Sequence, residues 1–167
     1  MIRLLVILLA TLLPHLGLSN PEIRSLWFKL DDANQKKNFI AKVDKQTEVT
    51  PAMDAYRAAA CMMKAEFTAL PNEKLHYFNT GKNLLEKCLQ NNPWNTECRF
   101  IRLTLQCKSP WFLGYHDNIE EDAQVVLDHF KLKYITTQND YWNNAKTFML
   151  GQSQIPDTIK KQLLNFR

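Results

Sequence analysis

Apolar side chains recur every three or four residues along most of this 167-residue chain, in stretches that end at proline, asparagine or glycine. This spacing places them on one face of a helix and is the pattern of amphipathic α-helices. Only four glycines occur, whereas ordinary usage would give roughly twelve. A β architecture with many tight turns would need more of them. The pattern therefore predicts an all-α fold of five to seven helices, built as helical hairpins or a bundle.

Local signals mark several of the expected helix ends. Thr50 followed by Pro51 predicts a helix start, with the hydroxyl as cap and the proline in the first turn. Asn118 precedes an acidic first turn at 120–122, where the helix dipole favours negative charge. Gly151 predicts a helix end. Strand-like alternation occurs only over residues 131–137, which does not change the all-α prediction.

The first nineteen residues have the organisation of a Sec-type export signal. Arg3 supplies a positive charge, residues 4–13 are almost entirely apolar, and Pro14 ends that run. Gly17 and Ser19 put small residues at the two positions that signal peptidases read. A membrane anchor is the alternative, but about ten apolar residues fall short of the roughly 20 that span a bilayer. Residues 1–19 are therefore predicted to be a removable signal peptide.

The remaining residues, 20–167, are predicted to form a single all-helical domain that is exported to a periplasm or outside the cell. No second stretch is apolar enough to span a membrane, so no stable span is expected after cleavage. The net charge is +4, from Lys and Arg that are interspersed along the chain. Nucleic-acid binders usually concentrate such charge in a stripe, and none is visible. No phosphate-binding loop or nucleophile motif occurs, so no cofactor is predicted.

Part of the chain resembles a tetratricopeptide repeat, whose second helix carries small, bulky and small residues and then a proline. The residues at those offsets are Gly81, Leu85, Cys88 and Pro93. Two departures limit the resemblance to about one repeat and a half. The preceding helix carries its matching residues about nine positions too early. The following helix has Arg99 and Arg102 where bulky apolar residues are expected.

Four blocks spread over most of residues 20–167 are similar to a family of small exported bacterial proteins of unassigned function. These blocks are residues 74–82, 97–103, 112–115 and 118–122. The resemblance implies a bacterial, exported, helical protein and supplies no activity. Many such relatives would carry ordinary residues where this chain has Cys88 and Cys98, so the resemblance does not imply an indispensable thiol.

The chain contains four cysteines without a CxxC spacing, so neither a metal knuckle nor a redox motif is predicted. Cys98 and Cys107 would lie on opposite faces of one helix, about 13 Å apart along its axis, too far for a bond. Cys88 and Cys98 would lie nearly level on the two sides of the turn at Pro93. A disulfide between them is therefore geometrically reasonable in an oxidising compartment. Separate buried thiols that act as small hydrophobes are the favoured alternative.

The loop at residues 110–118 carries Trp111, Phe112 and Tyr115, an aromatic density unusual for a connector. One hypothesis is an aromatic patch, extended by Arg99 and Arg102, that binds a protein or peptide of the cell envelope. The favoured alternative is that the loop folds its aromatics back over the core. In that case the two arginines could pair with the acids at 120–122 and pin the loop.

A second candidate lies directly after the aromatic residues. His116, Asp117, Glu120 and Glu121 could form an acid and histidine site or hold a divalent metal. Acidic residues are also what an ordinary helix first turn contains, and no second histidine is near, so no metal is predicted. The sequence thus favours a non-enzymatic binding or scaffold module of the bacterial envelope. The alternative is an exported enzyme whose site lies at residues 116–122.

Overall fold

The computed structural model describes residues 20–133 and 140–166, and in this part of the chain all regular structure is helical. The predicted all-α fold is confirmed. The described residues form eight α-helices, so the expected number of five to seven was too low. The helices are α2 (Pro21–Trp27), α3 (Ala33–Asp44), α4 (Pro51–Lys64), α5 (Pro71–Asn91), α6 (Thr96–Lys108), α7 (Ile119–Lys133), α8 (Asp140–Gly151) and α9 (Asp157–Leu163).

Helix starts follow local capping chemistry. Thr50 accepts a hydrogen bond from the Met53 amide at 3.2 Å, and Pro51 is the first helical residue of α4, as predicted. Asp32 and Gln35 form a reciprocal capping box that begins α3. Such caps satisfy amide groups that have no partner within the helix.

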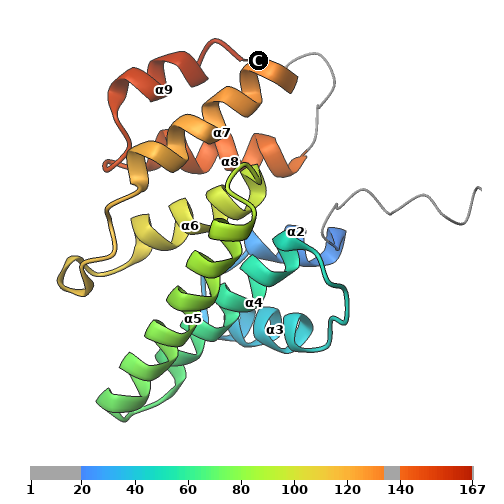
Figure 1. Cartoon of the computed structure of the whole chain (residues 1–167), viewed down its shortest axis with the longest axis vertical. Helices are drawn as coiled ribbons and strands as arrows, with labels where there is room; N and C mark the ends of the chain where they lie inside the picture. The colour runs from blue at the N-terminus through green and yellow to red at the C-terminus, as the bar shows by residue number, and fades with distance from the viewer. Residues whose placement is uncertain (1–19, 134–139, 167) are drawn as a thin grey trace, which may run out of the picture.

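The helices fall into two groups with α6 between them (Figure 1). Helices α3, α4 and α5 occupy the lower half in that view, and α7, α8 and α9 the upper part. Every residue from Glu97 to Cys107 of α6 is buried. The buried apolar residues of the described segments form one continuous cluster that extends from Ile23 to Leu163. Helix α6 therefore connects the packing of both groups.

Helices α4 and α5 approach each other closely at Gly81. A Cβ atom added to Gly81 would lie 2.5 Å from the carbonyl oxygen of Ala58 and 2.8 Å from the backbone nitrogen of Met62. It would also overlap the Met62 side chain. The two backbones touch here because position 81 has no side chain.

Two sequence predictions fall wholly or partly outside the described residues. These are the signal peptide at 1–19 and most of the strand-like segment at 131–137, whose first residues belong to α7. Within the described residues, no helix combines the length and the apolar character needed to cross a membrane.

Candidate functional site

The aromatic loop, residues 110–118, begins with one 3-10 turn, η2 (Trp111–Leu113), and then reverses at Gly114. Gly114 has φ 57° and ψ 39°, a left-handed conformation that costs a residue with a Cβ atom about 1–2 kcal/mol. The reversal leaves the side chains of Trp111 and Phe112 in solvent, 84% and 70% exposed. The tip of the loop therefore presents two aromatic rings outward.

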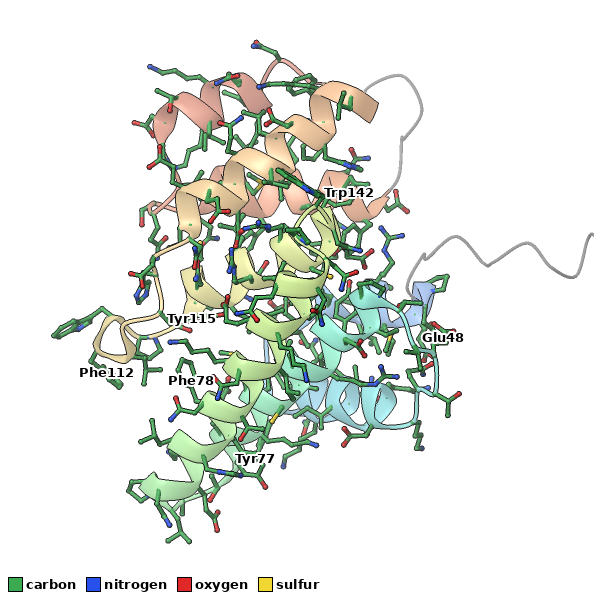
Figure 2. The ribbon with its side chains drawn as sticks, viewed as in Figure 1. Glu48, Tyr77, Phe78, Phe112, Tyr115 and Trp142 are labelled. Atoms are coloured by element: carbon green, nitrogen blue, oxygen red, sulfur yellow. The ribbon has the colours of Figure 1, made fainter. Side chains whose placement is uncertain are left out.

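Tyr115, on the other side of the reversal, points inward and is only 3% exposed. Its ring packs edge-on against Phe78 of α5, with 5.8 Å between the ring centroids (Figure 2). Its hydroxyl donates a hydrogen bond to Glu86 Oε1 at 3.0 Å. Burial and the neighbouring Glu86 carboxylate raise the pKa of this phenol well above its usual value. Tyr115 thus anchors the loop to α5.

A cluster of five charged residues, three of them buried, extends this anchor. We call it the Asp122 cluster, and its members are Glu86, Arg99, Arg102, Glu121 and Asp122. Asp122 is fully buried and accepts hydrogen bonds from Arg99 Nη1 at 2.9 Å, Arg102 Nε at 2.7 Å and Arg102 Nη2 at 2.8 Å. Arg99 also contacts Glu121, and Arg102 Nη1 donates to Glu86 Oε2 at 2.7 Å. Glu86 therefore accepts from both Tyr115 and Arg102, which joins the loop to α5, α6 and α7.

The electrostatics of the cluster reflect burial and mutual attraction. Burial raises the pKa of the Asp122 carboxyl, and the contacts with Arg102 and Arg99 oppose that rise. Burial by itself lowers the pKa of the Arg102 guanidinium. Hydrogen bonds and attraction from Asp122 and Glu86 outweigh this effect and raise the pKa above its ordinary value. Around the fully buried Asp122, the attraction between opposite charges offsets part of the cost of removing them from water.

These contacts decide between the two hypotheses for the aromatic loop. The proposed surface is wrong for Tyr115, Arg99 and Arg102, which are 3%, 9% and 5% exposed and face the interior. The arginines pair with the acids that follow the loop, as the alternative anticipated. That alternative is itself incomplete, because Trp111 and Phe112 do not fold back over the core.

Phe112 instead borders a feature that the sequence did not reveal, a groove of about 720 Å³ between α4, α5 and α6. Its walls are mainly apolar. Its apolar lining includes Met62, Met63, Leu75, Phe78, Leu105 and Phe112. Its lining also includes lysines 36, 74 and 108 and Glu66. Lys74, Lys108 and Glu66 are exposed, which places them at the edge of the groove. Trp111, although next to Phe112 in sequence, does not line it.

The sequence contains one signal of the groove, in the apolar residues of α5. The apolar period of α5 predicts that Leu75 and Leu84 lie on its buried face, yet the two side chains are 53% and 48% exposed. Leu75 lines the groove and Leu84 does not. The helical period of α5 is correct, but its first turns extend beyond the core.

The acid and histidine candidate does not assemble into a site. Nε2 of His116 lies 3.1 Å from the carbonyl oxygen of Ser109, and Glu121 is held by Arg99 and Asn118. Asp117 and Glu120 are exposed. Over residues 20–133 and 140–166, no three His, Cys, Asp or Glu side chains gather as metal ligands would.

The comparisons with known proteins add no relative. No family model, no curated protein and no solved structure matches this chain. Its functional assignment therefore depends on the groove and the loop themselves.

A second buried polar cluster lies away from the groove. The Tyr56 hydroxyl donates to Glu97 at 2.8 Å and lies 3.2 Å from the hydroxyl of Tyr141. Arg24 pairs with Glu97 at 3.2 Å and stacks over the Tyr141 ring at 3.9 Å. Burial raises the pKa of both phenols. The cluster connects α2, α4, α6 and α8, which gives it a structural role.

The four cysteines are free thiols, and two of them lie close together in space. The Sγ atoms of Cys88 and Cys98 lie 3.8 Å apart across the turn between α5 and α6. The hydrogen bond from Cys98 lowers the pKa of Cys88 and raises that of Cys98. Burial alone raises the pKa of Cys107 to about 11. Cys88 is thus the thiol of this pair that ionises first.

We expect mild oxidation with diamide to join Cys88 and Cys98. Each thiol gives up a proton and an electron to the azo bond of diamide, which becomes a hydrazide as the S–S bond forms. Closing a loop of this size should raise the free energy of unfolding by roughly 2–3 kcal/mol. Peptide mapping by mass spectrometry identifies the bond, and urea unfolding of the oxidised and reduced protein measures the gain.

The matched control for this oxidation is Cys98→Ala, which should show no bond and no gain in stability. A disulfide that involves Cys61 or Cys107 would contradict the assignment. So would oxidation at Cys88 and Cys98 that lowers the stability.

Proposed function

We propose that this chain is a non-enzymatic binding module that takes up a ligand with an apolar body in the groove between α4, α5 and α6. The observation that carries the proposal is the groove itself, about 720 Å³ in volume, with apolar walls and the ring of Phe112 at its edge. Small-ligand sites in proteins are usually concave, mainly apolar and roughly 300–1,000 Å³ in volume.

The loop that supplies Phe112 supports this function because it is already held in place. Tyr115 is buried against Phe78 and hydrogen-bonded to Glu86, and Glu86 is also bonded to Arg102. A ligand that contacts Phe112 therefore has little loop entropy to overcome. Binding to a preorganised site retains more of the interaction free energy.

The setting of this function is proposed from the sequence. The signal-like residues 1–19 support export to the bacterial envelope, where the partner would be a protein, a peptide or a smaller ligand rather than a nucleic acid. A tetratricopeptide-like pairing of α4 and α5 remains part of this proposal, supported by the contact at Gly81. The enzyme alternative has less support, because Glu121 and Asp122 are paired with arginines.

Phe112→Ala should weaken binding of the neutral dye N-phenyl-naphthylamine about tenfold, whereas Trp111→Ala should leave the affinity unchanged. Truncating an aromatic anchor commonly costs more than 1 kcal/mol of binding free energy, and a tenfold change corresponds to about 1.4 kcal/mol. The dye fluoresces in apolar surroundings, so a fluorescence titration measures its affinity.

The two variants are a matched pair, since both remove an exposed aromatic ring from the same turn. Neither ring is part of the core, so both variants should keep the wild-type unfolding free energy within about 0.5 kcal/mol. If the dye fails to bind the wild-type protein, or binds all three proteins equally, the groove is not the binding site.

A further inference from the structure

We propose that the ligand of the groove is a single-chain amphiphile with an anionic headgroup, such as a long-chain carboxylate. This inference rests on the proposed function, because it names the chemistry that the same groove accepts.

The charge at the edge of the groove is unbalanced toward positive. Three lysines but only one acid border it. Lys36 Nζ lies 2.6–2.8 Å from both carboxylate oxygens of Glu66, so these two neutralise each other. Exposed Lys74 remains, and Lys108, whose Nζ lies 5.9 Å from the centroid of the Phe148 ring, adds a second positive charge to the lining. An anionic group at this edge is therefore favoured over a cationic one.

The walls below that edge offer almost no polar recognition. The two hydroxyl groups in the lining, of Thr104 and Ser109, donate to carbonyl oxygens of their own helix at 2.9 and 2.7 Å. A sugar or nucleotide would lose its hydrogen bonds to water in this groove without gaining replacements. A hydrocarbon chain loses nothing of that kind.

Two methionines in the groove lining are well suited to contact a flexible alkyl chain. Met62 and Met63 of α4 are unbranched and polarisable, and such side chains adapt to irregular apolar ligands. A volume of about 720 Å³ is that of a small-ligand site. The apolar walls and limited volume of the groove match one alkyl chain, and the lysine ammonium groups at its edge match one acidic headgroup.

The methionines provide a site-resolved test by NMR of isotope-labelled methyl groups. Met62 and Met63 line the groove, while Met53 and Met149 are fully buried elsewhere and serve as internal controls. Dodecanoate, added below its micelle-forming concentration, should shift the Met62 and Met63 methyl resonances and leave the other two in place. Dodecyltrimethylammonium, with the same chain and the opposite charge, should bind about tenfold more weakly.

Charge reversal at the edge should exchange this preference. In Lys74→Glu/Lys108→Glu, dodecanoate should bind more weakly than the cationic amphiphile. The control Lys87→Glu/Lys161→Glu changes the net charge by the same amount at exposed positions outside the groove, and it should keep the wild-type preference.

The possible outcomes separate this inference from the proposed function. Equal binding of both amphiphiles, or a preference that both double variants change alike, overturns the anionic assignment while the dye still binds the groove. Shifts at Met53 and Met149 as large as those at Met62 and Met63 indicate general loosening and also overturn it. If neither amphiphile nor the neutral dye binds, the proposed function fails with it.

Discussion

Asp122→Asn is expected to lower the free energy of unfolding by about 3–5 kcal/mol, the cost of removing one partner from a buried ion pair. Asp122 is fully buried and accepts three hydrogen bonds from Arg99 and Arg102. An amide is nearly the same size but cannot balance the charge of two buried guanidinium groups. Urea unfolding followed by circular dichroism measures the loss.

The matched control is Glu121→Gln, which alters another acidic partner of the same arginines. The Glu121 side chain is 54% exposed, so its pairing is screened by water and should contribute less than about 1 kcal/mol. Comparable losses of unfolding free energy in the two variants would show that burial of Asp122 does not strengthen its pairing with the arginines.

Asp122→Asn should also weaken the attachment of the aromatic loop to the rest of the protein. Arg102 would lose its main partner, and its contact with Glu86 is shared with Tyr115. Hydrogen exchange of the loop amides should therefore accelerate more in Asp122→Asn than in Glu121→Gln. Unchanged exchange would mean that Tyr115 holds the loop without the arginines.

Gly81→Ala is expected to destabilise the protein by about 1–3 kcal/mol, although alanine favours a helix over glycine by up to about 1 kcal/mol. The added Cβ would lie 2.5 Å from the Ala58 carbonyl oxygen and overlap Met62, so α4 and α5 must move apart. Thermal or urea unfolding measures the effect. Met62 also lines the groove, so dye affinity should fall in this variant too.

Gly151→Ala is the control for this substitution. Gly151 is the last residue of α8, and a Cβ there meets nothing within 4 Å. The control should be neutral or slightly stabilising, because only helix propensity changes. If Gly81→Ala were as stable as Gly151→Ala, the two helices would have to be less closely packed than the structure shows.

The parts of the fold that were predictable depend on local chemistry. The Thr50 cap and the Pro51 helix start involve neighbours in sequence, and apolar periodicity identifies the helices. The small residue at position 81 was noted from its spacing, and the structure places it at the contact with α4. Helix ends are less predictable: the first proline after Pro51 is Pro71, but α4 already ends at Lys64 and is followed by a 3-10 turn.

The candidate site was harder to predict because it depends on contacts between distant residues. Glu86 and Tyr115 are separated by 29 positions, and nothing in either local sequence indicates their hydrogen bond. Arg99 and Arg102 violate the apolar pattern of α6, so the sequence allowed two interpretations, a binding surface or pairing with the acids at 120–122. Their burial is explained only when Asp122 of another helix is in place. The groove has the same origin, since several helices contribute its walls.

Gly114 separates the half of the loop that faces solvent from the half that faces the core, so the two halves can change in sequence independently. Tyr115 fastens the inward half to α5, whereas the rings of Trp111 and Phe112 contribute little to folding. Exchange of the Phe112 side chain would therefore alter which molecules the proposed groove site accepts while leaving the scaffold intact. The tip is a place where new selectivity can arise by point substitution, in nature or in the laboratory.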